Sequence, residues 1–102
     1  MNITDVKVFI RESNQLKAFV NIVIDDAFII RNIKVIEGKS GLFVAMPSRR
    51  VGNGEYRDIA HPINTETRNM IEKIIIDKYK EVLQEALSAA ETNEAPAVEE
   101  EE

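Results

Sequence analysis

The chain has 102 residues, enough for one domain, and its content of 44% apolar and 30% charged residues is typical of a globular protein. It contains no cysteine, which excludes disulfides and thiolate metal sites, and its single histidine cannot form a zinc site without several carboxylates. There is neither a signal peptide nor an apolar run of about 18 residues, so we expect a cytoplasmic protein that does not cross a membrane.

The net charge of −5 is concentrated at the C-terminus. Residues 1–90 contain all 13 Lys and Arg against 12 Asp and Glu, a net charge of +1, whereas residues 91–102 contain six Glu and no base, a net charge of −6. We therefore expect one folded domain over residues 1–90, nearly neutral and able to carry a local basic patch. Residues 91–102 are expected to form a disordered acidic tail.

Alternating apolar residues and turn signals predict four antiparallel strands in the first half of the chain. Their expected ranges are residues 3–10, 16–24, 28–37 and 42–46. Asp25 and Asp26 should form a tight turn between the second and third strands. Pro47, which cannot donate a ladder hydrogen bond, should end the fourth.

These strands carry more apolar side chains than one sheet face can bury. Strict alternation in the third strand gives two apolar faces, one with Ile29, Ile33 and Val35, the other with Phe28, Ile30 and Ile36. In the first strand it places Ile3 opposite the face of Val6, Val8 and Ile10. One helix covers only one face, so a second copy of the chain is the simplest cover for the other, and we expect a homodimer through the sheet. The alternative is an ordinary scatter of apolar residues on the surface.

A long amphipathic helix is predicted over residues 65–90, capped by Asn64 or Thr65. Its apolar residues recur every three or four positions, at Ile71, Ile74, Ile75, Tyr79, Val82, Leu83, Ala86 and Leu87. This stripe should pack on one face of the sheet. The expected fold is therefore α+β, with an antiparallel sheet of four to five strands and one long C-terminal helix.

The segment over residues 41–64, GLFVAMPSRRVGNGEYRDIAHPIN, concentrates the residue types suited to binding an anion. Arg49, Arg50 and Arg57 have planar donor forks that match phosphates and base edges. Asn53-Gly54 signals a tight hairpin turn, because both residues tolerate positive φ. We expect an arm or hairpin that presents the arginines to nucleic acid. The alternative is that they pair with Glu55 and Asp58.

Arg68 would lie in the first turn of the helix, where a cation is unfavourable for the helix itself. A phosphate contact would explain it, and Lys73, one turn further on, could extend the same patch. The alternative is an ion pair of Arg68 with Glu66 or Glu72.

His61-Pro62 is not expected to be catalytic. A catalytic histidine needs a nucleophile or metal and an orienting group, and nothing in the spacing links His61 to Ser48 or Asp58. We expect His61 to hydrogen-bond locally and Pro62 to stiffen the chain just before the helix. No phosphate-binding glycine motif or acidic metal cluster is present, so neither enzyme activity, a cofactor nor a small-molecule substrate is expected.

Four segments together resemble the stage V sporulation protein G (SpoVG) family of small bacterial proteins. They are ITDVKV, IVIDDAFIIRNIKVIEG, GLFVAMPSRR and EYRDIAHPIN followed by TETR. The resemblance covers about residues 1–87. It implies a sheet with a C-terminal helix that dimerises through the sheet, site-selective binding to DNA or RNA, and a role in sporulation and septum formation. By position, the nucleic-acid contacts would involve Arg49, Arg50 and the surroundings of Arg68.

Two functions therefore stay open. The first is a dimeric nucleic-acid-binding regulator, which would use Arg49, Arg50, Arg57, Arg68 and Lys73. The second is an interaction protein of the septation pathway, which would act through protein contacts without binding nucleic acid directly.

Overall fold

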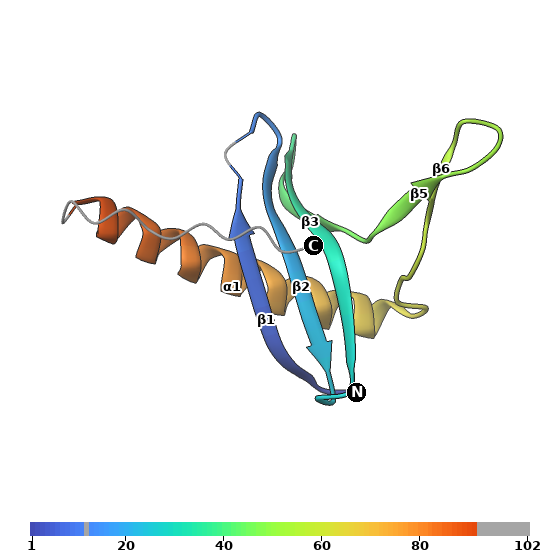
Figure 1. The fold of residues 1–102 in the computed structure, drawn as a ribbon, viewed down its shortest axis with the longest axis horizontal. Helices are drawn as coiled ribbons and strands as arrows, with labels where there is room; N and C mark the ends of the chain where they lie inside the picture. The colour runs from blue at the N-terminus through green and yellow to red at the C-terminus, as the bar shows by residue number, and fades with distance from the viewer. Residues whose placement is uncertain (12, 92–102) are drawn as a thin grey trace.

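The computed structural model describes residues 1–11 and 13–91. Figure 1 shows a sheet with one long helix behind it and a small hairpin that projects to one side. The elements in chain order are β1 (Ile3–Ile10), β2 (Leu16–Ile24), β3 (Phe28–Gly38), β4 (Gly41–Ala45), β5 (Ser48–Arg50), β6 (Tyr56–Asp58) and α1 (Thr65–Glu91).

The first four strands form an antiparallel sheet in the order β1-β2-β3-β4, and β5 and β6 form a separate two-stranded sheet. The predicted α+β fold with one C-terminal helix is confirmed. The turn after β2 is closed by the Ala27 amide, which donates to the Ile24 carbonyl at 2.9 Å. Asp25 and Asp26 both adopt positive φ there, the conformation of the tight hairpin turn that joins twisted strands.

The core lies between one face of the sheet and α1. The strands supply Ala18, Val20, Ile22, Ile33, Val35 and Val44, and the helix supplies Ile71, Ile75 and Tyr79. Asn64 caps the helix, as predicted: its Oδ1 accepts a hydrogen bond from the Thr67 amide at 2.7 Å. Helix and sheet therefore meet along the predicted apolar stripe as far as Leu83, whereas Leu87, at the end of the predicted stripe, is 51% exposed.

Strict alternation in the strands is interrupted at three bulges, one of which lies between Leu16 and Ala18 in the β2–β3 pair. The β2–β3 register shifts between Val20 and Ile22, and Asn32 adopts a φ of 66° there, so Ile30 joins the core face and Ile29 turns to the opposite face. The register of β1 shifts next to Ile3, whose side chain packs against the core cluster with Val6 and Val8. Each extra residue reverses the face of the residues beyond it.

The sheet face opposite α1 keeps a set of apolar side chains. By register these are Phe9, Leu16, Phe19, Val23, Ile29, Ile36 and Phe43. Ile29 and Phe43 are 47% and 44% exposed, which is high for large apolar residues. The Arg11 guanidinium lies over the Phe19 ring, 5.5 Å from its centroid. We call this surface the open face of the sheet.

The helix continues one residue beyond the predicted end, to Glu91. The rest of the predicted acidic tail, residues 92–102, lies outside the described residues. Within the described part, no helix is both long and apolar enough to cross a membrane.

Candidate nucleic-acid interface

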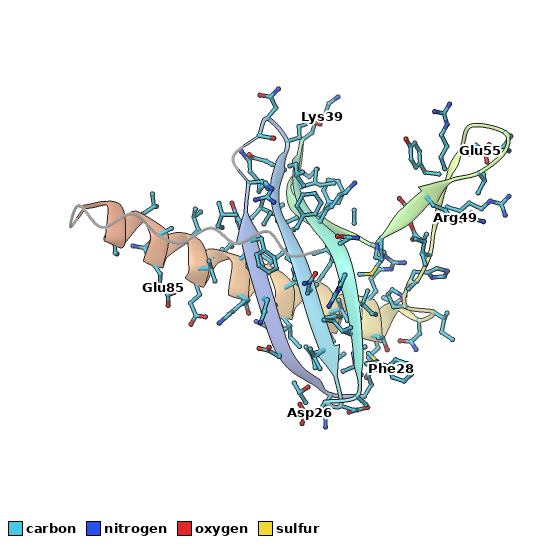
Figure 2. The ribbon with its side chains drawn as sticks, in the orientation of Figure 1. Asp26, Phe28, Lys39, Arg49, Glu55 and Glu85 are labelled. Carbon is cyan, nitrogen blue, oxygen red and sulfur yellow. The ribbon has the colours of Figure 1, made fainter. Side chains whose placement is uncertain are left out.

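The arginine segment folds into a ribbon, β5–β6, that stands away from the body of the protein (Figures 1 and 2). All six residues of its two strands are exposed. Its base is anchored by buried Pro47, whose carbonyl accepts a hydrogen bond from the Ile59 amide at 2.7 Å. The expected arginine arm is therefore present as a hairpin whose two faces both meet solvent.

The tip of the ribbon is a three-residue loop. The Val51 amide donates to the Glu55 carbonyl at 2.8 Å, and the Gly54 amide donates to the Val51 carbonyl at 2.9 Å. The Asn53 side chain accepts a hydrogen bond from the Glu55 amide at 3.0 Å. The turn predicted at Asn53-Gly54 is present, but only Gly54 has positive φ, 89°, as in a turn followed by a glycine bulge.

This loop fixes which side chains share a face of the ribbon. Arg49 pairs with Arg57, Arg50 with Tyr56, and Ser48 with Asp58. Because successive residues of a strand point to opposite faces, Arg49 and Arg57 lie on one face, and the other two pairs lie on the opposite face.

Like charges directly opposite each other weaken a strand pair unless something neutralises them. No ion pair joins Arg49, Arg50 or Arg57 to any other described residue, and the alternative pairing with Glu55 and Asp58 is not found. The Arg49–Arg57 pair thus places two donor forks side by side in solvent, the arrangement that suits neighbouring phosphate oxygens.

The two candidate contacts on α1, Arg68 and Lys73, differ from each other in whether an acidic side chain pairs with them. Arg68 is exposed, and no ion pair to Glu66 or Glu72 is found among the described residues. The Lys73 Nζ lies 2.8 Å from the Asp77 Oδ2, and this hydrogen bond and charge raise the pKa of Lys73. Positions 68 and 73 lie about 140° apart around a helix, so they do not share one face.

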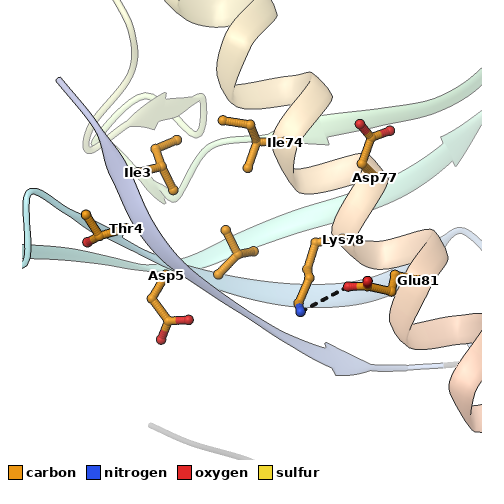
Figure 3. Close-up of a pocket in the computed structure, with 8 residues that line it drawn as sticks. Ile3, Thr4, Asp5, Ile74, Asp77, Lys78 and Glu81 are labelled. Carbon is orange, nitrogen blue, oxygen red and sulfur yellow. Dashed lines mark hydrogen bonds and ion pairs between the residues drawn. The ribbon is translucent and has the colours of Figure 1, made fainter.

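A shallow groove between β1 and α1 has the wrong charge for a polyanion. Apolar side chains of Ile3, Val6 and Ile74 line it, and its charged residues are Asp5, Asp77, Lys78 and Glu81 (Figure 3). The single cation, Lys78, is paired with Glu81 at 3.1 Å. The exposed arginines of the ribbon remain the stronger candidate for an anionic ligand.

His61 hydrogen-bonds locally, as predicted: its Nδ1 lies 3.0 Å from the Pro62 carbonyl oxygen. It lines a largely apolar pocket at the start of α1, together with Met46, Ile63 and Ile71. Among the described residues, no three His, Cys, Asp or Glu side chains come together in a way that could hold a metal ion.

One ribbon residue was not among the expected contacts. Tyr56 is 70% exposed and lies opposite Arg50. The signal in the sequence was an aromatic residue between Glu55 and Arg57 in an otherwise polar hairpin.

Comparison with known proteins gives a consistent result over the folded part of the chain. The SpoVG family model matches residues 1–81. A protein of Lachnospira eligens is 57% identical over 81 residues, which is 78% of this chain and 92% of the relative. One from Bdellovibrio bacteriovorus is 48% identical over 99 residues, 94% of this chain and 92% of the relative. One from Myxococcus xanthus is 50% identical over 86 residues, which is 84% of this chain and 87% of the relative. All three carry the name "Putative septation protein SpoVG".

Proposed function

Because the chain belongs to the SpoVG family, we propose that it is a homodimeric, site-selective DNA- or RNA-binding regulator of septation and sporulation. The name that its relatives carry supports the septation role, and the family is not named for an enzymatic reaction. The ribbon β5–β6 is the part of the protein that would contact nucleic acid.

A single observation carries the nucleic-acid proposal. Arg49 and Arg57 lie opposite each other on an exposed ribbon, without an acidic partner among the described residues. Folding gains nothing from this like-charge pair, whereas a polyanion supplies the missing negative charge. Arg50 and Arg68 would add contacts, and Lys73 would first have to leave Asp77.

The test is a titration of duplex DNA and of RNA with the wild type, Arg49→Ala, Arg57→Ala and the double variant across a range of salt concentrations. Removal of one phosphate-binding side chain should reduce the slope of log K against log salt by about 0.9 on duplex DNA. Lys39→Ala is the matched control, because Lys39 is an exposed cation outside the ribbon. Equal affinities and slopes for the wild type and the double variant would remove the ribbon from the interface.

The homodimer rests on the open face of the sheet. Burial of its apolar side chains against a second copy would remove Ile29 and Phe43 from water, and a two-fold assembly would present two ribbons to an extended site. Light scattering should then give about twice the 11.6 kDa chain mass. Phe43→Lys should shift the protein to monomer, and a wild type that is monomeric at high concentration would exclude this assembly.

A second candidate function is supported by exposed apolar residues next to the ribbon. Ile59 and Ile63, in the connection from β6 to α1, are 65% and 87% exposed. They could dock a protein of the septation pathway without any nucleic acid. If the wild type binds neither DNA nor RNA at low salt, this candidate replaces the first.

A further inference from the structure

The two faces of the ribbon have different chemistry. One face presents Arg49 and Arg57, which are suited to phosphates. The opposite face presents Arg50 beside Tyr56, together with the pair of Ser48 and Asp58. A ligand that contacts both faces must therefore carry a planar group for the aromatic ring as well as anionic groups for the guanidinium groups.

Tyr56 contributes little to the protein's own packing. Its side chain is 70% exposed, against 6% for Tyr79, the only other tyrosine. No described residue hydrogen-bonds to its hydroxyl, and no described cation lies over its ring. The flat face of the ring is thus available to a planar group from outside.

We propose that Tyr56 stacks on an unpaired base of a nucleic-acid strand while Arg49 and Arg57 hold the phosphates of the same strand. This inference rests on the proposed function and adds to it a preference for single-stranded or looped substrates. Arg50, the residue paired with Tyr56 across the ribbon, would extend the stacking surface, since guanidinium planes also stack on bases.

Binding by stacking needs an accessible base face, whereas insertion into a duplex groove does not. In a duplex both faces of a base are covered by its neighbours, and exposing one costs a few kcal/mol of unstacking. In a single strand or loop the base faces are accessible without that cost. An exposed tyrosine close to phosphate-binding arginines therefore favours unpaired substrates.

The experiment compares two ligands with the same phosphates. One is oligothymidylate of about 12 nucleotides, and the other is an abasic deoxyribose-phosphate strand of equal length. The variants are Tyr56→Leu, which removes the ring, and Tyr56→Phe, which keeps it. Phe28→Leu is the control, because Phe28 is an aromatic residue of similar exposure, 73%, in the β2–β3 hairpin and outside the ribbon.

We expect Tyr56→Leu to weaken binding of oligothymidylate by about 5- to 150-fold and to leave binding of the abasic strand unchanged. Tyr56→Phe and Phe28→Leu should bind both ligands like the wild type. The chain has two tyrosines and no tryptophan, so stacking should also quench the tyrosine fluorescence that Tyr56→Phe removes.

The other outcomes overturn the inference in distinguishable ways. If Tyr56→Leu weakens the binding of oligothymidylate and of the abasic strand by the same factor, the ring only supports the shape of the ribbon. No loss of either ligand, with weaker binding in Arg49→Ala, would exclude stacking and leave the proposed function intact. A wild type that binds neither strand nor duplex would refute the proposed function itself.

Discussion

Replacing Arg49 by glutamate should separate the stability of the ribbon from its binding activity. Arg49→Glu turns a like-charge pair with Arg57 into an opposite-charge pair at the same cross-strand position. Such pairs contribute about 0.2–1 kcal/mol each, and solvent exposure places this one at the low end. The combined change of about 0.5 kcal/mol should roughly double the ratio of closed to open ribbon, while nucleic-acid affinity falls because a phosphate contact becomes a repulsion.

Amide hydrogen exchange reports the stability of the ribbon directly, since a local opening need not change the global unfolding temperature. The informative amides are those of Val51 and Ile59, which donate to carbonyls across the ribbon at 2.8 and 2.7 Å. Their protection should rise about twofold in Arg49→Glu at low salt and less at high salt. Arg50→Glu, which faces Tyr56, is the control and should show no such gain. Reduced protection in Arg49→Glu, or the same gain in both variants, would refute the assigned register.

Three further changes test the fold. Asp26→Gly should raise the free energy of unfolding by about 0.5 kcal/mol, because glycine adopts the φ of 52° without strain; thermal melting measures this, and a lower melting temperature would contradict it. Asn64→Ala should lower the free energy of unfolding by about 1 kcal/mol through loss of the hydrogen bond to the Thr67 amide, whereas Asn64→Asp should not, as chemical denaturation would show. The pKa of Lys73 is raised by Asp77, so any stability that the pair gives is fully present below pH 10.5 and lost as the pH rises through the raised pKa. The difference between wild type and Lys73→Gln in denaturation should therefore vanish at high pH, and a difference that grows there would exclude this pair as its source.

The regular parts of the fold follow from periodicity. The predicted bounds of β1 and β2 are those observed, β3 ends one residue later than predicted, β4 begins and ends one residue earlier, and Asn64 is the helix cap. The bulge at Asn32 could not be predicted in the same way, because the consecutive apolar residues Ile29 and Ile30 before it fit either face of the sheet. Its position depends on contacts across the sheet, where the Asn21 side chain accepts a hydrogen bond from the Asn32 amide.

The ribbon illustrates the same limit at the candidate site. The sequence identifies three arginines around a turn, but the loop length decides which of them face each other. A two-residue turn at Asn53-Gly54 would pair Arg50 with Arg57 and leave Arg49 opposite Asp58. The three-residue loop moves the register by one and pairs Arg49 with Arg57 instead. A one-residue difference in a loop therefore decides whether an arginine faces an acid or another arginine.

The charged residues of the molecule are distributed unevenly along the axis of α1. The helix has 27 residues and spans about 40 Å, and the arginine ribbon lies beyond its first turn (Figure 1). The part of the helix that follows Lys80 contains acidic residues and no base. Within the described residues, the exposed arginines thus lie near one end of α1 and acidic residues follow Lys80 towards the other, and the field of a polyanion would turn the approaching protein with its ribbon forward before any contact forms.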